Sequence, residues 1–549
     1  MEREALRDGS TKKGDSESWL SSGVAHQTFN VAAVLLYSIT LGANMGYSAV
    51  LLPQLQSNTS FIPTDEETGS WIASLQSGVS PVGTVAGGFA MERWGRRFAM
   101  RAGLLPLFIG YIIIAFAPSH FTVLIGRFVT AISGGFSAAA SSIILCEIST
   151  PRLRGLYSSS IFTALSTGVL LVYALGSYLH WHIVAGVLAT IPLTSFTAFF
   201  FVPESPVWLA KKGLVEEAED AFTWLRGDEK QAKLELQELL SSIKAQREAE
   251  VMELDISNEE EADKTPTIMQ QIKILSSPSI LKPFFIGHIF NLFQILTGTM
   301  LVVFYAVDMI SETDKNTTGF TVAQLTAFVR LVFTLLTNTL LYYVPRRTHV
   351  TVASSVCACA ALTLSCFLFF QTRTTHSLSS ETSTWISTML ILVFIAANTC
   401  GFLPLPSTVM SEILPTKIRG LACSYIFAAN DALQFCVSKL YPWLKDTLEM
   451  HGVFLLFGIN ALFCCILSHL FLPETQGKSL AEIEEYFRDK NLLWAKRDKR
   501  LGQHNMRNKY LEMKETNARG CVKTYSEEQN IKTEEKPNKC ERKMSVTFS

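Results

Sequence analysis

Charged residues are scarce in this chain of 549 residues. Asp, Glu, Lys and Arg together make up 17% of it, whereas a soluble globular domain carries about 25%. The net charge is -1, and no basic stripe interleaved with aromatic residues occurs outside the C-terminal tail, which argues against a nucleic-acid partner. Hydrophobic residues account for 48% of the chain, and this composition indicates a membrane protein.

Signatures of catalysis and of metal binding are also missing. The chain contains no Ser/His/Asp set, no paired-carboxylate site and no P-loop, so we expect no enzyme activity, no nucleotide-driven pumping and no cofactor. Nine of the eleven Cys lie in apolar runs, without the spacing of metal ligands or of a disulfide framework. His180 and His182 flank Trp181, and two His without further ligands are more typical of an interfacial loop than of a metal site.

A cleavable signal peptide is not expected at the start of the chain. Residues 1–27 are polar and mixed in charge, and the apolar run that follows is too long for the hydrophobic core of a signal peptide.

Apolar stretches of about 20 residues, the length that spans a bilayer as a helix, occur throughout the chain. An even number of spans places both termini on one side, and the Lys/Arg-rich loops on that side predict that it is cytoplasmic. Sequons at Asn58 and Asn316 fall in loops on the opposite side, where glycosylation takes place. The twelve predicted spans are residues 28–51, 71–91, 98–117, 121–146, 155–178, 182–202, 284–307, 320–344, 351–371, 385–411, 418–441 and 452–472.

The two halves of the chain repeat each other, charges included. Glu147–Gly155 reads E-I-S-T-P-R-L-R-G, and Glu412–Gly420 reads E-I-L-P-T-K-I-R-G. Each copy has a basic pair upstream, in G-R-R at 95–97 and P-R-R at 345–347, and a Pro-Glu pair downstream, at 203–204 and 473–474. Duplicated halves with charges between apolar spans are typical of a transporter built from repeats.

Seven motifs in order resemble the sugar porters of the major facilitator superfamily. They are G-R-R at 95–97, Glu147…Arg154-Gly155, P-E-S-P at 203–206, Gln294…Gly298…Tyr305, Pro404-x-Pro406, Glu412…Arg419-Gly420 and P-E-T-Q-G at 473–477. The run G-Y-S-A-V-L-L-P-Q-L at 46–55 is further similar to insect facilitated trehalose transporters. The resemblance covers about residues 28–490 and implies an all-α membrane protein, with twelve transmembrane helices in two six-helix bundles around a central cavity.

The domain boundaries follow from these spans. We expect two helices in the linker, Leu214–Arg226 and Glu229–Glu250, the second with Leu236, Leu240 and Ile243 on one face, and an acidic solvated stretch at Glu253–Lys264. A short amphipathic helix is predicted after Lys478, and disorder after Leu501. The segments are a cytoplasmic N-terminal segment at 1–27, an N-terminal six-helix bundle at 28–202, a cytoplasmic helical linker at 203–283, a C-terminal six-helix bundle at 284–472 and a cytoplasmic tail at 473–549.

The charged motifs predict ion pairs at the cytoplasmic helix ends. Such pairs can hold the two bundles closed on the inside and must break when the site opens inward. The alternative is that the Arg residues only set the membrane topology, but the carboxylates would then be unexplained. The predicted gating residues are Arg96, Arg97, Glu147, Arg154, Glu204, Arg346, Arg347, Glu412, Arg419 and Glu474.

The positions that bind sugar in the family are mostly changed here. Gln294 matches the first of two adjacent glutamines, but Ile295 replaces the second. Because desolvating an unmatched polar group costs about 1–3 kcal/mol, the loss of such ligands disfavours an ordinary hexose. The remaining candidates for solute binding are Gln294, Asn44, Asn430, Gln434, Thr399, Arg330 and Asp431.

Three of these candidates carry specific expectations. Asn44 stands where proton-coupled sugar symporters have an Asp, so facilitated diffusion is favoured over proton coupling; a helix-packing amide is the alternative. Arg330 and Asp431, of opposite sign, occupy positions where the family has a neutral Asn and a Trp facing the cavity. We expect them to pair, because charges inside a membrane nearly always find a partner; separate hydration of each is the alternative.

The function favoured is a plasma-membrane facilitative carrier of a sugar or sugar-like polyol, with a small-molecule solute and the lipid bilayer as its partners. Two alternatives remain open: a carrier of a different small solute, including a charged one, and a non-transporting sensor that signals through its charged tail. A solute-uptake measurement separates transport from sensing.

Overall fold

A computed structural model describes residues 22–56, 62, 64–149, 154–257, 278–305, 319–373, 380–414, 419–472, 474–475 and 487. The sequons at Asn58 and Asn316 and the tail after Leu501 lie outside these residues, as does the helix predicted after Lys478 apart from the buried Phe487.

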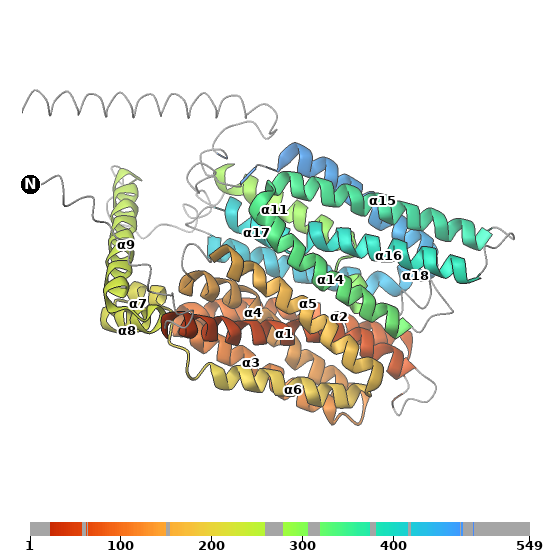
Figure 1. Cartoon of the computed structure of the whole chain (residues 1–549), viewed down its shortest axis with the longest axis horizontal. Coiled ribbons are helices and arrows are strands. Elements are labelled where there is room, and N and C mark those ends of the chain that lie inside the picture. The colour runs from red at the N-terminus through yellow and green to blue at the C-terminus, as the bar shows by residue number, and fades with distance from the viewer. Residues whose placement is uncertain are drawn as a thin grey trace, which may run out of the picture. The chain divides into compact units, whose positions relative to one another are not determined.

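The N-terminal bundle consists of six helices that follow the first six predicted spans (Figure 1). Close approach of α1 and α5 depends on glycine, since a Cβ at Gly42 would collide with the Leu165 carbonyl and one at Gly168 with the Ile39 carbonyl. The helices are α1 (Ser22–Gln56), α2 (Glu66–Trp94), α3 (Arg96–Ala115), α4 (His120–Ile148), α5 (Arg154–Tyr178) and α6 (Trp181–Ala198).

The C-terminal bundle contains broken helices. Gly298, with φ 78°, ends the first half of one span, and Pro404 separates the two halves of another. Glu449, with φ 54°, interrupts the last long helix. The elements are α11 (Pro278–Leu296), α12 (Leu301–Phe304), α14 (Gly319–Tyr343), α15 (Arg346–Arg373), α16 (Ser380–Phe402), α17 (Leu405–Ile413) and α18 (Arg419–Phe471).

Within the described residues, ten helices are long and apolar enough to cross a membrane. Helix α18 is one of the ten, and its break at Glu449 makes it two spans. Helix α2, with 29 residues, has sufficient length but is less apolar, and with it the count reaches the predicted twelve.

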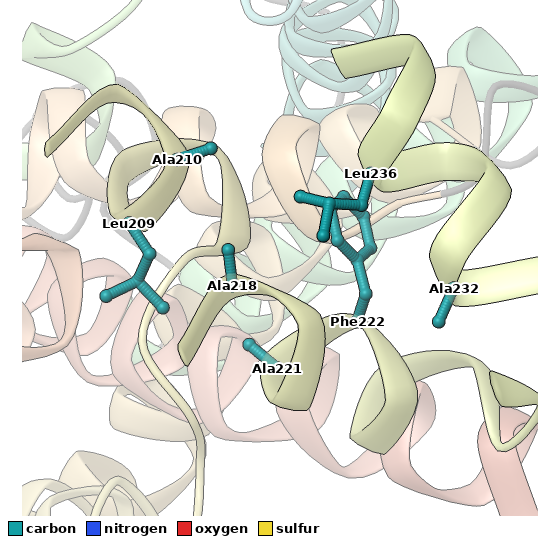
Figure 2. Close-up of a cluster of buried hydrophobic side chains, with 7 residues drawn as sticks. All are labelled: Leu209, Ala210, Ala218, Ala221, Phe222, Ala232 and Leu236. Atoms are coloured by element: carbon teal, nitrogen blue, oxygen red, sulfur yellow. The ribbon is translucent and has the colours of Figure 1, made fainter. Parts of the chain in front are cut away.

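Three further helices pack together beside the start of α1 (Figure 1): α7 (Pro206–Lys212), α8 (Val215–Arg226) and α9 (Glu229–Ser257). Their shared core consists of Leu209, Ala210, Ala218, Ala221, Phe222, Ala232 and Leu236 (Figure 2). Leu240 and Ile243 pack against it, so the predicted apolar face of the second linker helix is confirmed.

This helical linker is attached to the N-terminal bundle by specific contacts. The His26 ring of α1 stacks on Trp224 with centroids 4.4 Å apart, and its Nδ1 lies 2.9 Å from the Trp224 carbonyl oxygen. Arg226 donates from a terminal guanidinium nitrogen to the Ile148 carbonyl at the end of α4, at 3.1 Å. The linker therefore contacts the ends of α1 and α4.

The linker differs from the sequence analysis in two respects. Helix α7 was not predicted; its signal is the Ser205 hydroxyl, which accepts from the Trp208 N–H and so caps the helix, with Pro206 at its first position. Helix α9 continues past Glu250 to Ser257 and takes in part of the predicted solvated stretch, because no Gly or Pro interrupts it.

Candidate solute site and charged belt

A buried ion pair connects α3 to α4 at one end of the bundle. Arg96 holds Glu147 with two hydrogen bonds, from Nε at 3.0 Å and from a terminal nitrogen at 2.9 Å. The Ser205 hydroxyl also donates to the Glu147 carboxylate. The predicted ion-pair contact of Glu147 is therefore confirmed, and the geometry is the bidentate one that Arg forms best with a carboxylate.

The Glu204 carboxylate binds backbone rather than a guanidinium. It accepts from the N–H groups of Arg96 at 2.8 Å, Arg97 at 3.1 Å and Ser205 at 2.9 Å. Those first two N–H groups begin α3, where intrahelical acceptors are lacking. Burial raises the pKa of Glu204 above its ordinary value, although the three N–H donors and the Arg96 charge act in the opposite direction.

The second half of the chain repeats this arrangement. Glu474 accepts from the N–H groups of Arg346 at 3.0 Å and Arg347 at 3.1 Å. The Arg346 guanidinium bonds to the Leu341 carbonyl, as the Arg96 guanidinium bonds to Met91 in the first half. We call Arg96, Arg97, Glu147, Glu204, Arg346, Arg347 and Glu474 the charged belt.

The contacts of the charged belt described here stay within one bundle. The Arg97 side chain, for example, donates to the Phe199 and Phe200 carbonyls at the end of α6, at 3.0 and 2.7 Å. The contacts of Arg96, Arg97 and Glu204 thus tie α3, α4 and the end of α6 together, and the closing of the two bundles by these charges stays a prediction. The side chains of Arg154, Glu412 and Arg419, for which pairs were predicted, lie outside the described residues.

The two bundles instead meet along two seams made of other residues. Along the seam between α5 and α14, Gln324 donates to the Ser177 hydroxyl at 2.6 Å. The Ser166 and Thr334 hydroxyls lie 3.0 Å apart in the middle of this seam. Asn338 donates to the Thr163 hydroxyl at 2.8 Å towards the charged belt. This seam is therefore hydrogen-bonded along most of its length.

The seam between α2 and α18 is closed over only part of its length. Lys439 of α18 donates to the Ser70 hydroxyl at 2.6 Å and lies 4.2 Å from the centroid of the Trp71 ring. On the same face of α2, further towards the charged belt, two side chains are exposed: Val85 at 67% and Phe89 at 65%. The described side-chain contacts between α2 and α18 therefore lie in the middle of the seam and at its end away from the charged belt.

Several of the predicted solute ligands bind neighbouring protein groups instead. Gln294 donates to the Phe402 carbonyl at 2.6 Å and so joins α11 to the end of α16. Thr399 donates to the Ile395 carbonyl of its own helix. Gln434 donates to the Ser438 hydroxyl at 2.9 Å, but its side-chain oxygen and that of Asn430 have no hydrogen-bond partner in the described structure.

Asn44 belongs to a buried network around Arg127, a residue that the sequence analysis did not single out. Arg127 is fully buried and donates to the Asn44 side-chain oxygen at 3.0 Å, the Ser48 hydroxyl at 2.7 Å and the Ile72 carbonyl at 3.3 Å. Asn44 in turn donates to Gln76 at 2.7 Å. An Arg inside the span 121–146 was a signal available in the sequence, because intramembrane charges usually mark function.

The expected ion pair between Arg330 and Asp431 is absent among the described contacts. Arg330 donates to the Thr299 carbonyl at 3.1 Å, in the stretch between α11 and α12. Asp431 accepts from the Ser80 hydroxyl of α2 at 2.6 Å. The prediction of a pair was wrong, because each charge finds a neutral partner on a different helix.

A hollow of about 630 Å³ lies beside the seam between α5 and α14. It contains none of the predicted solute ligands, and residues of α1 such as Leu35 and Ile39 form one of its walls. Its rim includes Leu335 and Tyr343, which are exposed, so it opens sideways and is separate from the candidate site.

Comparison with known proteins agrees with this architecture. The family model described as "Sugar (and other) transporter" matches residues 29–487. The chain belongs to this family. It is therefore a multi-pass membrane protein with the major facilitator fold, and its relatives are transporters rather than enzymes.

Among curated relatives, the facilitated trehalose transporter Tret1 of Drosophila mojavensis is 29% identical over 463 residues, covering 83% of this chain and 51% of the relative. The chain thus spans about half the length of the first such relatives. A Tret1-2 homologue from Drosophila sechellia is 28% identical, covering 83% of this chain and 90% of the relative.

The chain is also similar to solved structures. The inward-open xylose transporter XylE from E. coli has a TM-score of 0.64 and 19% identity, and the match covers 84% of this chain and 99% of XylE. At that level of identity the likeness concerns the fold.

Proposed function

We propose that the protein is a facilitative transporter of a small, sugar-like solute that works by alternating access in the plasma membrane, with both termini cytoplasmic. Membership of the transporter family supports transport, and the names of the trehalose and xylose transporters support a sugar-like solute. The seam between α2 and α18, whose described contacts lie in its middle and at its end away from the charged belt, supports alternating access.

The observation that carries the facilitative part of the proposal is the network around Arg127. Its guanidinium is held by Asn44, Ser48 and the Ile72 carbonyl, all of them neutral. A proton-coupled carrier needs a group that gains and loses a proton during the cycle. The Asn44 amide does neither near neutral pH. Transport would therefore follow the solute gradient.

In this proposal the solute binds between the bundles, at the polar positions predicted from the sequence. The side-chain oxygens of Asn430 and Gln434 are the best placed to accept hydroxyl hydrogens, because neither has a donor among the described residues. A hydroxyl bound there would donate a hydrogen bond to these oxygens. A buried oxygen that lacks such a donor lowers the stability of the folded protein.

The charged belt would act as a brace within each bundle. Its contacts tie helix ends together inside the N-terminal bundle and again inside the C-terminal bundle. Each bundle can then rock as a rigid body while the seam between α2 and α18 opens and closes.

The proposal is tested by uptake into liposomes that contain the purified protein. We expect saturable uptake of at least one of trehalose, glucose and xylose, driven by its gradient alone, and a loss of about tenfold or more in Asn430→Ala/Gln434→Ala. Lys233→Ala, an exposed change in α9 of the linker, is the matched control and should transport normally. Absence of uptake for every sugar and sugar derivative, with folded protein in the membrane, would contradict it.

A further inference from the structure

Arg330 is a buried cation in the middle of α14. Its exposure is 5%. A charge at this position in a membrane helix is unfavourable unless it meets a partner of opposite sign or lines a cavity. Its protein partners therefore decide what else it can bind.

The neighbours of Arg330 along α14 place it on the boundary between the bundles. Gln324, six residues earlier, bonds to Ser177 of α5, and Thr334, one turn later, lies 3.0 Å from Ser166 of α5. Arg330 therefore lies level with the middle of the bilayer, where carriers of this construction bind their solute.

Neutral groups are the described partners of Arg330. One terminal nitrogen donates to the Thr299 carbonyl at 3.1 Å, and no carboxylate within the described residues lies at ion-pair distance. The carboxylate of Asp431 is hydrogen-bonded to Ser80 instead. The fully buried Arg127 uses Nε and both terminal nitrogens, whereas Arg330 retains N–H groups without a described acceptor.

We propose that Arg330 binds the anionic group of the solute, so that the transported sugar is a sugar carboxylate or sugar phosphate; this rests on the proposed function as a sugar-like solute carrier. The planar guanidinium offers two parallel N–H donors, which fit a carboxylate or a phosphate better than they fit a single hydroxyl. The bound anion also supplies an opposite charge, which the described residues around Arg330 do not provide.

Three probes that differ in one group test this assignment. Glucuronate differs from glucose in having a carboxylate at its terminal carbon, and glucose 6-phosphate has a phosphate there. In liposomes we expect glucuronate or glucose 6-phosphate to be taken up about 10- to 100-fold better than glucose, the effect of hydrogen bonds to a charged partner. The comparison between the two anions shows which of them the site accepts.

Two variants show whether the preference depends on Arg330. Arg330→Gln should lower the ratio of anion to glucose uptake by the same 10- to 100-fold, whereas Arg330→Lys, which retains the charge, should keep most of it. Arg127→Gln is the matched control: it removes a buried Arg with neutral partners and should reduce uptake of all three probes without changing their ratio.

The outcomes distinguish a failure of the anion site at Arg330 from a failure of the proposed function as a sugar carrier. Glucose taken up in preference to both anions, or an unchanged ratio in Arg330→Gln, overturns the anion site but leaves a sugar carrier. No uptake of any probe by folded wild-type protein, together with no uptake of trehalose or xylose, overturns both. If Arg330→Gln does not fold, the wild-type ratio of glucuronate to glucose uptake still decides.

Discussion

The Ser80 hydroxyl of α2 donates to the Asp431 carboxylate of α18 at 2.6 Å, and this contact joins the two bundles in the middle of the membrane. Further along the same seam, Lys439 bonds to Ser70 and lies over the Trp71 ring. We call the contact of Asp431 with Ser80 and the contacts of Lys439 with Ser70 and Trp71 the α2–α18 clasp. The clasp must open whenever α2 and α18 separate at the end away from the charged belt.

Lys439→Gln should shift the protein towards the conformation that is open at the end away from the charged belt. A partly exposed cation–π contact contributes about 0.5–1 kcal/mol, so the open fraction should rise roughly two- to fivefold. The rise is measured by labelling a cysteine introduced at Ser74 with a reagent applied from that side. Ser74 is buried on α2 in the described conformation.

A matched control for this change exists in the linker. Lys212 lies over the Trp208 ring at 5.6 Å, so Lys212→Gln removes the same kind of contact away from the seam. Equal labelling in both variants would show that the clasp does not hold the seam closed.

Loss of Arg96 should slow transport more than loss of its exposed neighbour Arg93. Arg96→Ala leaves the Glu147 carboxylate buried without its guanidinium, and breaking a buried pair in this way costs about 3–5 kcal/mol. We expect initial uptake per molecule at the membrane to fall at least tenfold. Arg93→Ala, a change in the last turn of α2, should stay close to wild type, and similar rates in both variants would refute the brace.

The sequence was sufficient for the membrane-spanning helices but not for α7 or for the contacts between helices. Apolar length and the repeated motifs predicted twelve spans, since both depend on local composition. The prediction that Arg330 pairs with Asp431 was wrong. Opposite charges on α14 and α18 do not show which neutral groups lie nearer to each of them. The repeat predicted that Arg96 meets Glu147, but not that Glu204 binds backbone N–H groups, because main-chain donors leave no trace in the sequence.

The raised pKa of Glu204 predicts how the stability of the charged belt depends on pH. Burial is the main cause of the increase, so the folded protein binds this proton more tightly than the unfolded chain does. The contribution of the group to stability is therefore greatest below the ordinary pKa of glutamate and is lost as the pH rises through the raised value. Melting temperatures of wild type and Glu204→Gln, measured in detergent at several pH values, should differ most in favour of wild type at the lowest pH. A difference that grows in favour of wild type with rising pH would contradict the direction of the shift.

Uptake by the wild-type protein should not depend on a proton gradient, and Asn44→Asp should create such a dependence. The Asn44 side-chain oxygen lies 3.0 Å from a guanidinium nitrogen of Arg127, so an Asp there forms a buried ion pair in the described conformation. When the helices move and the pair loosens, the uncompensated carboxylate becomes costly in the apolar interior, and binding a proton removes that cost. Uptake is measured with and without an uncoupler: the wild type should be unaffected, and the variant should lose several-fold. Because Asp431 is a second carboxylate between the bundles, Asp431→Asn is tested in parallel. Inhibition of the wild type that disappears in Asp431→Asn would place proton coupling in α18 and overturn the facilitative reading.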